Sequence, residues 1–161
     1  MKIIDVLGKE IEFDCMGCDI AYHKMIPPGG YVYEDNLINI SADPVIPIPG
    51  FMILGIKKHI KSINELSKVE RYQIMDVLNL TIEKMKECDI TKEVLIIQEE
   101  NARHFHIWIV PIYEWMAQFD KSVSNIDRII KYSYEICDDN TKDEILKSIE
   151  KLKYAFSNTK Q

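Results

Sequence analysis

The nine residues from His104 to Ile112, HFHIWIVPI, constrain the fold of this chain more than any other segment. Apolar side chains fill most of the run and Pro111 stands near its end, which predicts a β-strand. Side chains alternate between the two faces of a strand, so His104, His106 and Trp108 are expected to share one face. The opposite face then carries Phe105, Ile107 and Ile109. The chain must therefore build a sheet with a core on one side and two imidazoles on the other.

Paired histidines on one strand face differ from an ordinary core residue. A lone histidine on a strand is usually a hydrogen-bonded part of the core, but two on one face need two sets of polar partners. Trp108 flanks the pair. We therefore interpret His104 and His106 as part of a functional site.

The N-terminal third of the chain predicts strands joined by turns. Residues 1–14 alternate between apolar and polar around Gly8-Lys9, which predicts a hairpin. Residues 15–30 are expected to be irregular, because they end in the breaker Pro-Pro-Gly-Gly. Further strands are expected at residues 31–34, 37–40 and 51–56. Prolines between the last two predict an extended connection.

The middle of the chain predicts one long helix followed by strands. Residues 67–89 form the clearest helix, because Ser67 with Glu70 makes a capping box and apolar residues recur every three or four positions. The expected apolar stripe is Met75, Leu78, Ile82 and Met85. A strand at residues 93–98 precedes the histidine strand.

The last forty residues predict two helices, at 124–137 and 141–157. Thr141 with Glu144 repeats the capping pattern. The second helix carries an apolar stripe of Ile145, Ile149, Leu152 and Phe156. Strands, a helix, two strands and then helices predict an α+β fold with helices packed on an antiparallel sheet. We assign residues 1–120 to one domain and 121–161 to a C-terminal helical extension packed on it.

Composition limits the kinds of partner. The 161 residues suffice for one domain, and the net charge of −6 comes from scattered rather than clustered basic residues. Duplex nucleic acid is therefore not expected as a partner, although a local pocket can still hold a small phosphorylated ligand. The charged N-terminus has no signal-peptide pattern, and no apolar run is long enough to span a membrane. We expect a cytoplasmic protein.

Cys15-Met-Gly-Cys18 is the second motif that carries chemistry. Its spacing allows two thiolates to reach one tetrahedral metal ion from a tight turn. A redox dithiol has the same spacing, but such a pair normally opens a helix, and here prolines and glycines follow. Two unrelated surface thiols remain the alternative. Zinc takes four ligands and histidine is the usual supplement, although His59, beside two lysines, could equally be a surface residue.

The chain resembles the histidine triad (HIT) superfamily of nucleotide hydrolases and transferases. The family motif alternates three histidines with apolar residues, and this sequence reads His104-Phe-His106-Ile-Trp108-Ile-Val110. Upstream, YEDNLINISADPVIPIPGFMILGIKKH is similar to the family's acidic turn, strand, Pro-Gly-His and Lys-Lys-His stretch. The resemblance covers about residues 15 to 116. It implies a HIT-like antiparallel sheet packed with helices, and homodimers, which are common among such proteins.

The resemblance also implies a metal site. Zinc-containing members, and the related galactose-1-phosphate uridylyltransferases, hold the metal with Cys-x-x-Cys, a mid-chain histidine and the first histidine of His-x-His. Those positions fall on Cys15, Cys18, His59 and His104. The implied cofactor is a structural zinc ion that ties the N-terminal loop to the sheet.

His106 falls at the family's nucleophile position. There the imidazole attacks the α-phosphorus of a nucleotide and forms a covalent nucleotidyl-histidine. A neutral imidazole is nucleophilic near pH 7, and a backbone carbonyl can hold its other nitrogen. The resemblance implies a nucleotide hydrolase or nucleotidyltransferase acting on a nucleotide or a dinucleoside polyphosphate.

Four further residues are candidates for nucleotide binding. Asp43 falls where the family binds the ribose hydroxyls, or it is a turn residue before Pro44. Gln98 falls near the phosphate position, or it is a solvated strand end. Arg103 could hold phosphate as a fork, or it is an exposed charge. Trp108 stands where the family has its third histidine.

Departures from the family pattern support an alternative function. Trp108 replaces the third histidine, and its indole N–H cannot shuttle a proton at neutral pH. Phe51 replaces the histidine of Pro-Gly-His, and the loop before the motif is shortened to residues 99–103. The alternative is a zinc-stabilised module that binds a nucleotide with little or no catalysis.

Overall fold

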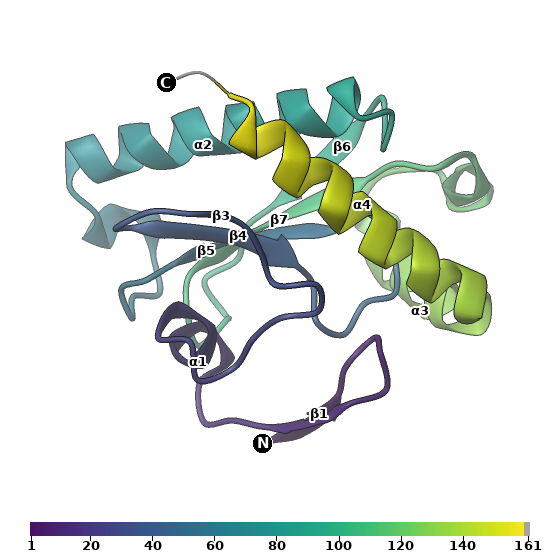
Figure 1. The fold of residues 1–161 in the computed structure, drawn as a ribbon, viewed down its shortest axis with the longest axis horizontal. Coiled ribbons are helices and arrows are strands. Elements are labelled where there is room, and N and C mark those ends of the chain that lie inside the picture. Colours follow the sequence, from purple (N-terminus) through teal and green to yellow (C-terminus); the bar gives the residue numbers. More distant parts are fainter. Residues whose placement is uncertain (160–161) are drawn as a thin grey trace.

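A five-stranded antiparallel sheet forms the centre of the computed structural model, which describes residues 1–159 (Figure 1). Its strand order is β3-β4-β5-β7-β6, and all neighbouring strands run antiparallel. The strands are β3 (Tyr31–Glu34), β4 (Ile38–Ala42), β5 (Met52–Ile56), β6 (Val94–Ile97) and β7 (His106–Pro111). The predicted α+β fold is confirmed.

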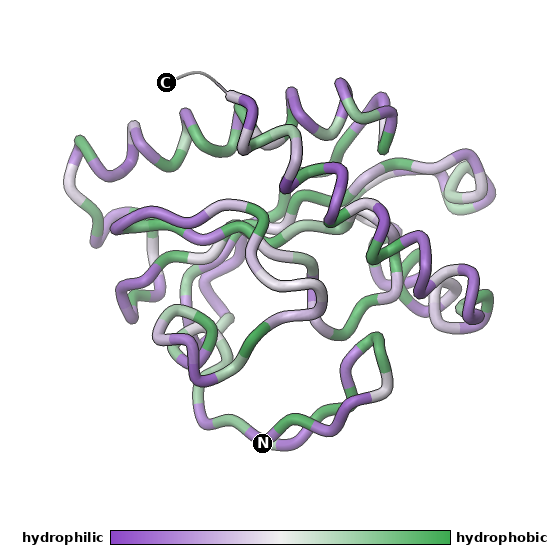
Figure 2. The backbone as a smooth tube through the Cα atoms, viewed as in Figure 1, coloured by the Kyte–Doolittle hydropathy of each residue, from purple (hydrophilic) through white to green (hydrophobic). Residues whose placement is uncertain are grey.

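Two long helices lie on one side of this sheet (Figure 1). They are α2 (Lys68–Glu87) and α4 (Asp139–Ser157). Figure 2 shows hydrophobic and hydrophilic residues alternating from turn to turn along both helices. Their apolar stripes meet the sheet in the main core, whose fully buried members include Ile38, Ile40, Met52, Leu54, Ile56, Ile74, Met85, Phe105, Ile109 and Ile149. Alternation along β7 therefore sends Ile107 and Ile109 into this core, as predicted.

The opposite side of the sheet carries the N-terminal segment (Figure 1). The predicted hairpin is present as β1 (Lys2–Ile4) paired with β2 (Glu10–Glu12). It is followed by the short helix α1 (Met16–Ala21), which contacts β5. A second hydrophobic cluster lies around Phe51, Val110 and Ile129, the last from α3 (Ile126–Glu135). Short 3-10 helices at Ile63–Glu65, Glu114–Phe119 and Val123–Asn125 complete the chain.

The capping prediction for α2 is confirmed. Ser67 is the N-cap, its side chain accepts from the Glu70 N–H, and the Glu70 carboxylate accepts from the Ser67 N–H at 2.9 Å. One member of the predicted stripe is wrong, because Met75 is 54% exposed. Ile74 takes its place in the core, because it lies one turn before Leu78 on the face that also carries Met85.

The C-terminal helices lie close to their predicted positions. The N-cap of α4 is Asp138, whose carboxylate accepts from the Thr141 N–H at 2.8 Å. The predicted box of Thr141 with Glu144 is therefore wrong, because Thr141 occupies the third position of the helix rather than its cap. The stripe is right: Ile145, Ile149 and Leu152 are buried in the main core, and Phe156 packs against it.

Two predicted boundaries near the histidines and cysteines are wrong. Residues 15–30 are not wholly irregular, since α1 forms within them. The histidine strand begins at His106, so His104 lies in the bend before β7. Strand alternation thus places His106 and Trp108 on one face, while His104 is oriented by other contacts. Among the described helices, none is both long and apolar enough to cross a membrane.

Candidate metal centre and the adjoining cavity

The two cysteines project from the first turn of α1. Cys15 is the N-cap residue, and its carbonyl accepts from the Asp19 N–H at 2.9 Å. Cys18 follows within the same turn, and its carbonyl accepts from the Tyr22 N–H at 2.9 Å. One helical turn therefore brings the two sulfurs to one side, although the motif alone predicted no helix here.

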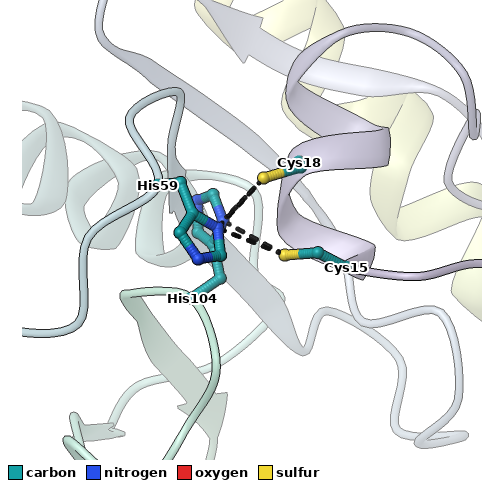
Figure 3. A group of neighbouring side chains, drawn as sticks. All are labelled: Cys15, Cys18, His59 and His104. Carbon is teal, nitrogen blue, oxygen red and sulfur yellow. Dashed lines mark hydrogen bonds between the residues drawn. The ribbon is translucent and has the colours of Figure 1, made fainter.

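Two histidines meet these sulfurs (Figure 3). Nδ1 of His59 lies 3.6 Å from Sγ of Cys15 and 3.1 Å from Sγ of Cys18. Nδ1 of His104 lies 3.5 Å from each sulfur. The candidate ligand atoms of the four residues all lie within 4.8 Å of one another. The structure thus brings together all four residues that the sequence suggested as metal ligands.

The orientation of His104 is set from its far side. Its Nε2–H donates to the Ile56 carbonyl at 2.6 Å, which leaves the Nδ1 lone pair directed at the sulfurs. The side chain is 6% exposed. Gly17 of α1 lies so close to this ring that a Cβ there would overlap it. A bare backbone at position 17 therefore lets α1 approach the imidazole.

The four ligand atoms fit a zinc ion by donor chemistry and by spacing. Two thiolates and two imidazoles form the Cys2His2 set of structural zinc sites. In a tetrahedral site with Zn–S of about 2.3 Å and Zn–N of about 2.05 Å, sulfur and nitrogen stand about 3.5 Å apart. The sulfur–nitrogen distances of 3.1 to 3.6 Å match this value. The site is a structural zinc centre by its ligands, since four protein donors leave no open position.

Charge balance in the cluster also favours a cation. Burial raises the pKa of the Cys18 thiol to about 11, and the hydrogen bond and charge of Cys15 add to the effect. Two thiolates this close are therefore costly without a positive ion between them. Burial lowers the pKa of His104 against the effect of its bond to Ile56, which keeps that ligand neutral. Neutral imidazole is the form that binds metal.

A cavity of about 320 Å³ opens beside the metal centre, between α1 and the sheet. Its volume falls within the range of small-molecule sites, which starts at about 300 Å³. Its walls come from the N-terminal segment, from β4 and β5, and from the bend before β7. The lining residues include Phe13, Met16, Ile20, Asn39, Ser41, Asp43, Ile53, Gly55, Arg103 and His106.

His106 lies in this cavity with one nitrogen committed to the backbone. Its Nδ1 is 2.9 Å from the carbonyl oxygen of His104. A carbonyl can only accept, so Nδ1 carries the hydrogen and the neutral ring keeps its lone pair on Nε2. Nε2 is therefore the ring nitrogen that remains available for further contacts.

Asp43 also lines the cavity, just beyond the end of β4. Its Oδ1 accepts from the N–H groups of Val45 and Ile46, at 2.8 and 2.7 Å. Burial raises the pKa of the Asp43 carboxyl, opposed by these N–H groups and by His106. Oδ2 accepts no hydrogen bond within residues 1–159. One oxygen thus holds the turn, and the other remains available to a ligand.

The remaining three candidates lie in different surroundings. Arg103 is exposed and lines the cavity. Gln98 is exposed beyond the end of β6 and is not among the lining residues. Trp108 does not line the cavity either. Its ring stacks edge-on against Phe51 at 5.4 Å between centroids, and it belongs to the second hydrophobic cluster.

Two lining residues were missed in the sequence. Asn39 and Ser41 stand on β4 two residues apart, on the face that also carries Asp43. The signal was the alternation of polar residues 39, 41 and 43 with Ile40 and Ala42. A polar strand face usually meets solvent, but here α1 covers it.

Solved structures of histidine triad proteins share this fold, although the sequence matches no family model and no curated protein. A HIT-like protein involved in cell-cycle regulation from Bartonella henselae has a TM-score of 0.61 at 13% identity, over 89% of this chain and 98% of that one. A zinc-bound histidine triad family protein from Mycobacterium smegmatis has a TM-score of 0.59 at 15% identity, over 88% and 97%. A hypothetical histidine triad nucleotide-binding protein from Sulfolobus tokodaii has a TM-score of 0.58 at 21% identity, over 91% and 99%.

Proposed function

Because the chain has the fold of the histidine triad proteins, we propose that it is a nucleotide hydrolase or nucleotidyltransferase. His106 is its nucleophile, and the α-phosphate of a nucleotide or dinucleoside polyphosphate is the point of attack. The observation that carries this proposal is the 2.9 Å hydrogen bond from His106 Nδ1 to the His104 carbonyl, in a residue that lines the cavity. In the neutral ring this bond leaves the lone pair on Nε2.

The reaction proceeds in two displacements at phosphorus. Nε2 of His106 forms a bond to the α-phosphorus, the bond to the leaving-group oxygen breaks, and that oxygen departs with the rest of the substrate. Water or another hydroxyl then attacks the same phosphorus, the nitrogen–phosphorus bond breaks, and the incoming group loses its proton. Two displacements let one pocket stabilise both phosphoryl transition states.

Neighbouring residues support binding of the substrate. Asp43 Oδ2 is an acceptor suited to the ribose hydroxyls. Arg103 lines the same cavity and supplies positive charge for the phosphate. Gln98 is a further candidate for phosphate, reached only if the substrate extends beyond the cavity. Zinc at Cys15, Cys18, His59 and His104 has a structural part, because the ion holds α1 against the sheet and takes no part in the displacements.

The test is a covalent adduct on His106. We expect mass spectrometry of protein incubated with dinucleoside polyphosphates and nucleotide-sugar analogues to detect a nucleotidyl group on this residue. His106→Ala should abolish the adduct and lower turnover by at least about 1000-fold, as loss of a nucleophile does. His23→Ala is the matched control, since His23 is half-exposed and paired with Glu34 outside the cavity. Absence of both adduct and turnover over a broad panel would refute the hydrolase.

A second candidate function is nucleotide binding without cleavage. It is favoured by the contact of Phe51 with Trp108, which places two aromatic rings at positions where the family has histidines. Neither ring can protonate a leaving group. For such a module, a bound nucleotide is recovered unchanged and His106→Ala leaves its dissociation rate as it was.

Homodimerisation is part of the proposal. β6 is an edge strand of the sheet, and its four residues, Val-Leu-Ile-Ile, are all apolar and none is fully buried. An apolar edge strand is a surface that proteins usually cover. A second copy of the chain would cover it.

A further inference from the structure

Two polar side chains of β4 are buried without hydrogen-bond partners. Asn39 is 3% exposed and Ser41 is 1% exposed, and both line the cavity. Neither the carboxamide of Asn39 nor the hydroxyl of Ser41 forms a hydrogen bond with any side chain or backbone group in residues 1–159. A fully enclosed amide without partners would cost roughly 1–3 kcal/mol, so such groups are normally paired or remain accessible to solvent or a ligand.

Their polar atoms must therefore face the cavity. Within the described residues, no side-chain nitrogen or oxygen is both fully enclosed and unpaired. The small area that these two residues keep accessible consequently includes their polar atoms. Since both residues line the cavity, this area is where a bound molecule would meet them.

A glycine gives the Asn39 carboxamide its position. Asn39 pairs with Gly55 of β5, and Gly55 pairs with His106 of β7, so the three lie in one row across the sheet. A Cβ at Gly55 would stand 2.8 Å from Oδ1 of Asn39. The carboxamide thus extends over the bare backbone of Gly55, toward the strand that carries His106.

The rest of the wall suits a flat ring. Around Asn39 and Ser41 the cavity is lined by Phe13, Met16, Ile20 and Ile53, which are apolar. Ligand sites commonly combine apolar walls with a few polar groups that fix orientation. A carboxamide offers a donor and an acceptor side by side, which matches the edge of a nucleobase.

We infer that Asn39, together with Ser41, determines which base the cavity accepts by hydrogen-bonding the edge of its ring. The inference rests on the proposed function in taking the ligand to be a nucleotide. The base lies between α1 and β4, its phosphate lies toward His106 and Arg103, and its ring edge meets the carboxamide over Gly55.

The test compares ligands that differ only in the base. Binding of AMP, GMP, CMP, UMP and ribose 5-phosphate is measured by calorimetry for the wild type, Asn39→Leu, Asn39→Asp, Ser41→Ala and Gly55→Ala. We expect the wild type to prefer one base and to bind ribose 5-phosphate more weakly. Asn39→Leu should weaken the preferred nucleotide about tenfold, as loss of hydrogen bonds to a buried group does, and leave ribose 5-phosphate within about twofold.

The other variants separate recognition from folding. Asn39→Asp keeps the shape and replaces the amide donor by an acceptor, so the order of preference among the bases should change. Gly55→Ala should reduce the preference with Asn39 in place, because the new methyl displaces the carboxamide. Melting temperature and metal content identify any variant that is merely misfolded.

Two results would overturn the inference, and only one of them would also overturn the proposed function. If the wild type binds nucleotides and every variant keeps the same order of preference, base recognition by Asn39 is wrong while the proposed function stands. If the wild type binds none of the nucleotides, both are wrong.

Discussion

The His104 imidazole is held at both of its nitrogens. Nε2 donates to Ile56 of β5, and Nδ1 faces the two cysteine sulfurs. Its backbone carbonyl in turn accepts from His106. The neighbouring histidines therefore have separate tasks: one completes the metal centre and supports its neighbour, while the other faces the cavity.

Loss of one thiolate tests the metal centre. We expect wild-type protein to contain about one zinc ion per chain, and Cys18→Ser to contain almost none, because three donors bind structural zinc far more weakly than four. Zinc content per chain is measured by elemental mass spectrometry. The melting temperature should also fall, by about 2–4 °C for each kcal/mol lost in a chain of this size.

Cys137→Ser is the matched control for this experiment. Cys137 is likewise a half-buried free cysteine, and it lies outside the ligand cluster. Its replacement should leave zinc content and melting temperature nearly unchanged. Equal metal content in the two variants would remove Cys18 from the ligand set.

Among the elements, the turn between β3 and β4 places the strand that lines the cavity. The Asp35 carboxylate accepts from the N–H groups of Leu37 and Ile38, both at 2.7 Å. It also accepts from the Tyr33 hydroxyl at 2.7 Å and from Gln73 of α2 at 2.8 Å. A single ionised group thus joins the turn, the sheet and the long helix.

This carboxylate should make stability depend on pH in the acid range. Burial would raise the pKa of Asp35, but the bonds from Ile38, Tyr33 and Leu37 outweigh it and hold the pKa below its ordinary value. Because the folded pKa is the lower one, the stabilisation is present above the ordinary pKa of an aspartate and is lost as pH falls through the folded value.

Asp35→Asn measures that contribution. We expect a loss of about 1.5–3 kcal/mol at pH 7, the range for hydrogen bonds to a charged group, and little difference from wild type near pH 2. Urea unfolding at the two pH values checks it. Asp139→Asn is the control, since the Asp139 side chain is almost fully exposed. A difference that persists unchanged in acid would contradict the role given to the ionised group.

The packing of α4 on the sheet predicts different effects for a buried and an exposed residue of this helix. Ile149 is fully buried in the main core, while Tyr154 on the same helix is 73% exposed. Ile149→Ala should lower the free energy of unfolding by about 2–5 kcal/mol, and Tyr154→Ala should change it by less than about 0.5 kcal/mol. Equal effects would mean that α4 does not pack on the sheet in solution.

Sequence patterns predicted the elements with strong local signals. The Pro-Pro-Gly-Gly breaker predicted where β3 begins, and Ser67 with Glu70 predicted where α2 begins. Both signals act within a few residues. α1 has only six residues and no periodic pattern, and it forms where its cysteines and Gly17 pack against His104. The sequence shows that Asn39 and Ser41 share a polar strand face, but that this face lines a cavity follows only from the tertiary structure, which covers it with α1.

For the site, local sequence patterns identified the cysteine pair and the histidine pair as separate candidates. Bringing His59 and His104 to the same ion required the resemblance, since nothing near either residue specifies a partner so distant in the sequence. The structure then added what no pattern contains: the acceptor for each imidazole nitrogen.

For the whole molecule, the prediction concerns how many copies of the chain assemble. The exposed β6 edge and the fold lead us to expect a dimer, with a mass in light scattering twice that of one chain. Ile96 of β6 is 43% exposed, and Ile96→Lys should yield a monomer because a charge on an apolar edge opposes pairing. Val69→Lys, at a position 73% exposed on α2, should leave the dimer intact.

If the wild type and both variants are monomers, the apolar edge of β6 does not mediate self-association. A dimer that survives Ile96→Lys would place the contact on another surface. In both cases the cavity, which lies within one chain, should keep the nucleotide affinity that we propose for it.

The segment that forms the short helix α1 contributes to both the metal centre and the cavity. Cys15 and Cys18 supply ligands for the ion, while Met16 and Ile20 form a wall of the cavity. Chelators used during purification would therefore loosen that wall. Protein batches that contain less zinc should therefore show a higher apparent dissociation constant for the proposed nucleotide ligand. Adding zinc back to a stripped batch should restore the lower value.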